Sequence, residues 1–154
     1  EEPVTVGIRP DVMDPAVSHV ISLDPGVPSH GVATSGLGGR SLTRGIASAA
    51  TVVARTASLA DAAATAVANA SLVEDKQVWR RTAEELDPYT DIPGLEVTVK
   101  VGPLSEEKKR RAVLQAVRRA EDLVRRGVIL GAFVAVQGTH GMTAYLRDRL
   151  LEPA

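Results

Sequence analysis

Two polar stretches of the sequence carry residue types that could bind a phosphorylated ligand. The first reads Gly-Val-Ala-Thr-Ser-Gly over positions 31–36 and continues with Gly38-Gly39-Arg40-Ser41. Glycines let backbone N–H groups approach a ligand closely, and an arginine guanidinium offers a fork of donors that suits phosphate. The spacing matches neither a Walker loop nor a Rossmann loop. Two interpretations stay open, a flexible link or a ligand-binding loop that uses Thr34, Ser35, Gly36, Arg40 and Ser41.

The second stretch is alanine-rich and carries three polar residues spaced four apart, Asp61, Thr65 and Asn69. In a helix these three lie on one face. The stretch has neither Lys nor Glu, so we expect the helix to be buried and its polar face to meet a partner. A carboxylate and a hydroxyl one turn apart can hold Mg²⁺, which prefers oxygen ligands. The structural alternative is that Asp61 helps to cap the helix while Thr65 and Asn69 bond to neighbouring backbone.

Composition excludes several other kinds of chemistry. The chain has no cysteine, which removes disulfides, cysteine zinc sites and thiol nucleophiles. Its three histidines, His19, His30 and His140, share no close spacing of the kind that a local metal motif shows. We expect His19 to be a packing residue in a strand and the other two to lie in surface loops.

The charge pattern and the hydropathy pattern restrict the partners. The net charge is −1, and the basic residues of the segment 105–126 alternate with acidic ones and with no aromatic residue for stacking. We therefore expect no nucleic-acid binding. No apolar run reaches about 18 residues, so we expect no membrane span and a cytoplasmic location. The sequence does not decide whether the chain forms a homo-oligomer.

The elements that must position these residues are expected to form an α+β fold, with helices packed on a mixed sheet. Only 3% of the residues are aromatic, so the core must consist of Val, Leu, Ile and Ala. The apolar periodicity predicts strands and helices along the whole chain. The strands are expected at Pro3–Arg9, Val17–Leu23, Gly31–Thr34, Ala49–Arg55, Leu95–Val101 and Val128–Val136, and the helices at Ser58–Ser71, Asp75–Leu86, Ser105–Arg126 and Met142–Leu151.

The order of these stretches resembles the C-terminal half of the ApbE-type flavin transferases. The resemblance rests on Gly31–Gly36, then Ala49–Ala54 as a strand, then the Ala-Asp-x-x-Ala-Thr element within Leu59–Ala66. The chain is similar still more closely to a small uncharacterised family related to these enzymes. Three further segments are similar to the family, namely Asp87-Pro88, Val97–Leu104 and Gly127–Ala132. The resemblance therefore covers most of the chain from Gly31 to Val136.

ApbE-type enzymes bind FAD and, with Mg²⁺, transfer FMN to a threonine of a partner protein. The resemblance implies that Asp61 and Thr65 are the Mg²⁺ ligands, and that Thr34, Ser35 and Gly36 lie beside the flavin nucleotide. Two features depart from the family. Gly38–Gly45 stands where the family has a His-x-x-Asp-Pro-x-Thr-Gly motif, and the family's Asp-Leu-Gly-Gly segment would lie upstream of Glu1.

These observations lead to two hypotheses about function. The first is an ApbE-like protein with a site for FAD or a related phosphorylated small molecule and Mg²⁺-dependent FMN transfer. The second is a noncatalytic binding or assembly protein that keeps the ApbE-like fold. Under both, residues 1–154 form one ApbE-like domain, and we expect an N-terminal portion of that domain to lie outside this sequence.

Overall fold

A four-stranded antiparallel sheet forms the middle layer of the molecule. The computed structural model describes residues 2–27 and 29–151. Within them the sheet has the order β3 (Gly31–Ser35), β4 (Ala49–Ala54), β7 (Gly131–Val136), β8 (Thr139–Met142). Every residue of β4 and β7 is buried, as befits strands covered on both faces.

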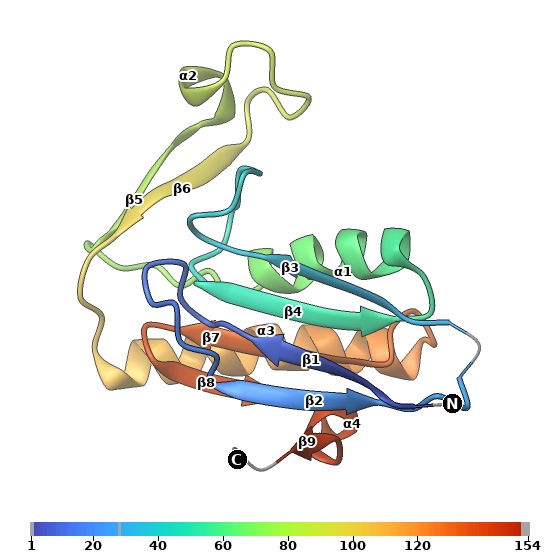
Figure 1. Ribbon diagram of the computed structural model, residues 1–154. Coiled ribbons are helices and arrows are strands. Elements are labelled where there is room, and N and C mark those ends of the chain that lie inside the picture. The colour runs from blue at the N-terminus through green and yellow to red at the C-terminus, as the bar shows by residue number, and fades with distance from the viewer. Residues whose placement is uncertain (1, 28, 152–154) are drawn as a thin grey trace.

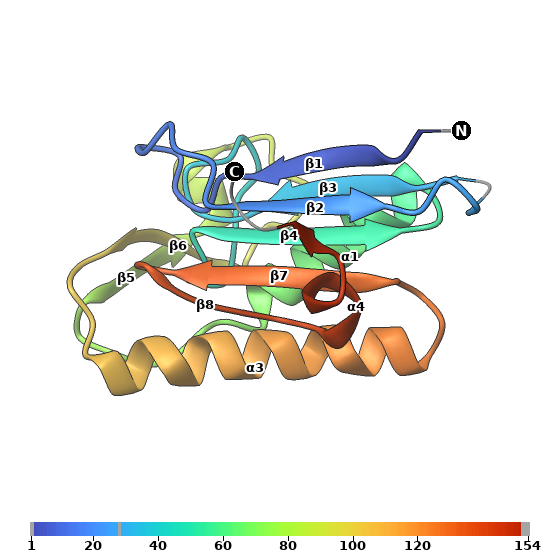
Figure 2. The same cartoon turned by 60° about the horizontal axis from the view of Figure 1, so that its bottom comes forward.

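Different layers cover the two faces of this sheet (Figure 1). The helices α1 (Ala57–Asn69) and α3 (Glu106–Arg125) pack on one face. A small second sheet packs on the other face, in the order β1 (Val4–Ile8), β2 (His19–Leu23), β9 (Leu150–Leu151). Figure 2 shows α3 running alongside β7 and β8. The α+β class predicted from the sequence is confirmed, and all strand pairs among the described residues are antiparallel.

Small side chains allow the helices to approach the sheet and each other. Ala60, Ala64 and Ala68 on α1 and Ala116 and Ala120 on α3 are all fully buried. Alanine adds little bulk at a contact, so the backbones come close while the packing stays dense. The second core, between the two sheets, contains the larger Phe133, Ile21 and Leu146.

A hairpin projects from the body as an arm (Figure 1). It consists of β5 (Val78–Thr82), the short helix α2 (Ala83–Leu86) and β6 (Glu96–Val101). The prediction of a helix over Asp75–Leu86 is therefore wrong for all but its last four residues. The segment 78–82 contains β-branched and aromatic residues, and pairing with β6 completes its backbone hydrogen bonds.

The C-terminal segment also differs from its prediction. Only α4 (Ala144–Arg147) is helical within Met142–Leu151. Its flanks belong to strands, because Met142 ends β8 and Leu150–Leu151 pairs with β2. A local pattern does not reveal the pairing of Leu150–Leu151, since its partner strand β2 lies far away along the chain, whereas β8 pairs with β7, the strand directly before it.

The long helix α3 matches its prediction closely. Ser105 caps it by accepting a hydrogen bond from the Lys108 N–H over 3.3 Å, and Gly127 follows its end with a φ of +71°. Val113 and Ala120 are buried, whereas Arg110 is exposed. Within the described residues, no helix combines the length and apolarity that a membrane crossing requires.

Candidate functional site

Helix α1 exposes the face that carries Asp61 and Thr65. Its opposite face is buried, so the expectation of an enclosed helix holds for one side only. The N-cap is Thr56, because the Thr56 hydroxyl accepts a hydrogen bond from the Leu59 N–H over 3.3 Å. Asp61 is the fifth residue of the helix and has no capping role in the structure.

The other two polar residues of this face bond to backbone. The Thr65 hydroxyl donates to the Asp61 carbonyl oxygen over 3.3 Å. The Asn69 side-chain oxygen accepts from the Arg44 N–H over 2.9 Å. Thr65 and Asn69 thus make the contacts of the structural alternative, while the Thr65 oxygen keeps lone pairs for a further partner.

Ser71 fixes the polar loop to the end of α1. Its buried hydroxyl accepts hydrogen bonds from the N–H groups of Ile46 and Ala47, each over 2.9 Å, and donates to the Ala68 carbonyl over 2.6 Å. Gly45 makes this approach possible, since a Cβ there would lie 1.8 Å from the Ala68 oxygen. These contacts hold the loop beside the C-terminal half of α1 and not beside its N-terminus.

The loop, helix α1 and the tip of the arm line an open hollow of about 470 Å³, which we call the arm hollow. Arg40, Ser41 and Leu42 come from the loop, and Thr65 comes from α1. The remaining lining belongs to the arm tip and consists of Asp87, Tyr89, Thr90, Asp91 and Ile92. Three segments far apart in the sequence therefore meet at one place that offers a cation, several hydroxyls and two carboxylates.

The contribution of the arm tip was missed in the sequence. Asp87 and Asp91 are typical turn residues, and the Asp87 carboxylate does accept a hydrogen bond from the Tyr89 N–H over 2.9 Å. This turn leaves the Tyr89 side chain 96% exposed. The sequence did offer one indication of this contribution, the Asp87-Pro88 pair that belongs to the resemblance. The residues around this pair do not indicate which other loop the arm tip contacts.

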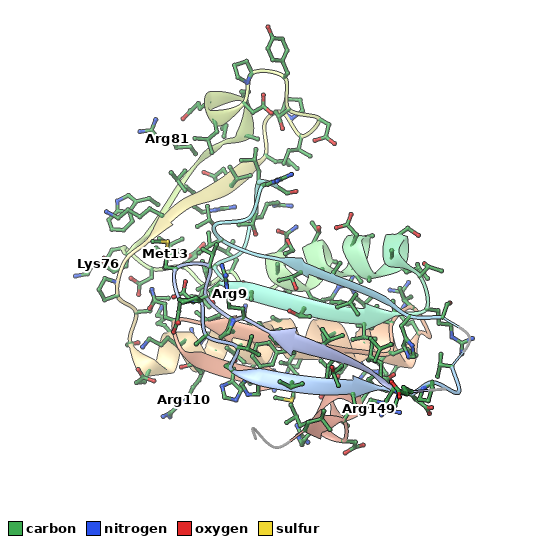
Figure 3. All side chains as sticks on the ribbon, in the orientation of Figure 1. Arg9, Met13, Lys76, Arg81, Arg110 and Arg149 are labelled. Carbon is green, nitrogen blue, oxygen red and sulfur yellow. The ribbon has the colours of Figure 1, made fainter. Side chains whose placement is uncertain are left out.

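Thr34, Ser35 and Gly36 line a separate hollow of about 200 Å³, which we call the strand hollow. Its other residues include Arg9, Val12, Ser48 and Gly39. Figure 3 shows Arg9 at the end of β1, away from Arg81 on the arm. The two groups of predicted ligand-binding residues thus line two hollows, and the segment Leu37–Gly39 separates them along the chain.

A closed metal site is absent from the part of the chain that the structure describes, which holds no group of three or more His, Asp or Glu residues suited to a metal. Asp61 and Thr65 offer two oxygens, one turn apart, on an exposed face. Mg²⁺ wants near-octahedral coordination and often takes the rest from water and phosphate. The donor set therefore fits Mg²⁺ only together with a phosphorylated ligand, and Arg40 in the neighbouring hollow suits such a ligand.

Comparison with known proteins gives one result that bears on identity. No curated protein and no solved structure matches the chain significantly. The family model described as AbpE bacteria matches residues 1–142, which is most of the chain. The chain therefore belongs to the AbpE bacteria family.

Proposed function

We propose that this protein binds FAD or a related flavin nucleotide, together with Mg²⁺, in the arm hollow. The observation that carries the proposal is that Arg40 and Ser41 of the loop line one hollow with Thr65 of α1, although the loop and Thr65 lie apart in the sequence. Its volume of about 470 Å³ falls within the range of about 300–1,000 Å³ typical of small-molecule sites. Membership of the AbpE bacteria family is compatible with the resemblance to ApbE-type enzymes, and the link to FMN transfer is part of our proposal.

Four lining residues have a role in this proposal, together with Asp61, which lies one turn before Thr65 on α1 and outside the lining itself. The Arg40 guanidinium pairs with a phosphate oxygen, and the Ser41 hydroxyl donates to another. Asp61 and Thr65 hold Mg²⁺, whose remaining ligands are phosphate oxygens and water. Tyr89 is exposed at the rim and offers an aromatic face for a ring of the nucleotide.

FMN transfer is the reaction that the resemblance implies for such a site. The hydroxyl of an acceptor threonine would attack the FMN phosphorus, the pyrophosphate bond would break, AMP would leave, and the hydroxyl proton would pass to water. The bound Mg²⁺ would offset the charge that develops on the phosphate oxygens. From this chain, Arg40 would orient the pyrophosphate, since a positioned guanidinium stabilises the same charge.

A noncatalytic binding protein is the second candidate function. Among the described residues that line the arm hollow, none is a histidine, lysine or cysteine. The histidine-containing motif of ApbE-type enzymes is replaced by Gly38–Gly45. Both observations favour binding without transfer.

A binding titration tests the common part of both candidates. Purified protein is titrated with FAD in the presence of Mg²⁺ and again in the presence of a chelator. We expect saturable binding only with Mg²⁺, and at least about tenfold weaker binding in Arg40→Ala, because a charge-assisted contact contributes about 1.5–3 kcal/mol. Arg110→Ala is the matched control, since it removes the same charge from an exposed position on α3 (Figure 3). Equal binding by both variants would contradict the proposal.

Transfer is then tested separately. FAD, Mg²⁺ and a threonine-containing acceptor peptide are incubated with the protein, and AMP is measured. Release of AMP with covalent FMN on the peptide supports the enzyme, whereas binding without AMP supports the noncatalytic candidate.

A further inference from the structure

Two histidines from different sheets meet on the side of the molecule that faces away from α1 and α3. His19 lies on β2 and His140 lies on β8, and their ring centroids are 4.6 Å apart at an angle of 68°. Both rings also contact Phe133 of β7, at centroid distances of 4.8 Å and 5.6 Å. The sequence shows no motif here, because 120 positions separate the two residues.

A hydroxyl fixes one nitrogen of the His19 ring. Ser18 Oγ lies 2.6 Å from His19 Nδ1, which is a short hydrogen bond. When Nδ1 carries the proton and donates to this oxygen, the lone pair of the His19 ring lies on Nε2. Histidines that bind metals commonly donate their other ring N–H to an oxygen in this way, which fixes both the tautomer and the ring orientation.

The pair is accessible from solvent. His140 is exposed and His19 is half-buried. Imidazole nitrogens suit Zn²⁺, Ni²⁺ and Cu²⁺, whereas Mg²⁺ prefers oxygen ligands. Because the described residues contain no group of three or more His, Asp or Glu suited to a metal, the remaining coordination positions at this pair fall to water or to an added ligand.

We propose that His19 and His140 form an open binding site for a divalent transition-metal ion of the Zn²⁺, Ni²⁺ and Cu²⁺ class. The site is distinct from the Mg²⁺ position of the proposed function in both its place and its ligands. An ion held there would link β2 of the small sheet to β8 of the central sheet. A ligand that binds the folded state in preference to the unfolded state stabilises it, so this ion should raise the melting temperature.

Calorimetric titration of the untagged, chelator-treated chain with Zn²⁺ tests the site. We expect one equivalent to bind, and His140→Gln to abolish this binding. Ser18→Ala should weaken it by about tenfold or more, because loss of an outer partner of a ligand typically costs 10–100-fold in affinity. His30→Gln is the matched control, since it removes the third histidine of the chain and should leave the affinity unchanged.

A spectroscopic measurement keeps the proposal open to refutation if a variant disturbs the fold. Electron paramagnetic resonance of one bound equivalent of Cu²⁺ should show coupling to two imidazole nitrogens in the parent chain and to one in His140→Phe, which keeps an aromatic ring beside Phe133. Zn²⁺ binding that survives in both His140 variants would overturn the proposal, as would a Cu²⁺ spectrum without coupling to two imidazoles. The FAD titration with Mg²⁺ should be unaffected in both variants, so the two proposals fail independently.

Discussion

The side-chain oxygen of Asn69 accepts a hydrogen bond from the backbone N–H of Arg44 over 2.9 Å. This contact joins the last residue of α1 to the loop that carries Arg40 and Ser41. On the other side of the loop, the Thr43 carbonyl accepts from the Thr98 N–H over 2.8 Å, which connects the loop to β6 of the arm. The same short segment therefore sets the spacing between all three walls of the arm hollow.

Asn69→Ala should loosen this loop. The Arg44 N–H loses its protein partner, and a hydrogen bond of this kind contributes about 0.5–1.5 kcal/mol to stability. We expect a loss of about 1 kcal/mol in the free energy of unfolding by urea, together with weaker FAD binding. Asn69→Asp keeps the acceptor oxygen, so this variant should retain most of the stability and most of the FAD affinity of the parent. An equal loss in the two variants would show that the hydrogen bond is not the cause.

Ser71→Ala should be more damaging. It leaves the N–H groups of Ile46 and Ala47 without their acceptor in a buried position, where each unsatisfied group costs about 1–3 kcal/mol. We expect the free energy of unfolding to fall by at least about 2 kcal/mol. Ser58→Ala, on the exposed first turn of α1, is the control and should stay within about 0.5 kcal/mol of the parent. Comparable melting temperatures for the two variants would refute this assignment.

Elements with strong local patterns were predicted well. Helix α3 has a capping serine, a terminal glycine and a continuous apolar face, and strands β4 and β7 are apolar runs apart from Thr51 in β4. The prediction of a helix is wrong for residues 75–82 because their apolar spacing also suits a helix, and the pairing with β6 that decides the outcome involves residues about 20 positions away.

The candidate site was predicted in part for the same reason. The spacing of Asp61, Thr65 and Asn69 is local, so their shared helix face could be inferred. The meeting of Thr65 with Arg40 depends on Ser71 and Gly45, which carry no recognisable pattern. The separation of Thr34 from Arg40 into two hollows likewise depends on tertiary packing.

Stability should fall as the pH is lowered because of His19. Its pKa is lowered from the ordinary value of about 6.5, first by burial and then by the charge of the neighbouring His140. Between the lowered folded pKa and 6.5, the unfolded state binds more protons, so stability rises with pH through this window. The full stability is present above this window and is lost as the pH falls through it.

Melting temperatures measured with a chelator from about pH 5.5 to pH 7.5 check this dependence. His19→Phe keeps a ring against Phe133 but cannot be protonated, so its melting temperature should vary less with pH than that of the parent. Ser18 and His140 are the polar groups that contact the His19 ring in the structure, and both are retained in this variant. If the melting temperatures of parent and variant change with pH in parallel, His19 is not the source of the pH dependence.

Asp61→Asn should separate metal binding from helix stability. Asp61 is exposed, lies past the first turn of α1 and makes no capping contact, so its replacement should change the free energy of unfolding by less than about 0.5 kcal/mol. Mg²⁺ needs the carboxylate, because Thr65 alone supplies a single neutral oxygen. We therefore expect Mg²⁺-dependent FAD binding, measured calorimetrically, to disappear in this variant.

Thr56→Ala is the opposite control for the same helix. Thr56 caps α1, so this variant should lose about 1 kcal/mol of stability while it retains Mg²⁺-dependent binding. If the Asp61→Asn variant binds FAD with Mg²⁺ as tightly as the parent chain does, then Asp61 holds no metal. The exposed carboxylate would then be one more solvated charge on α1, and the arm hollow would need to bind its phosphate through Arg40 and Ser41 alone.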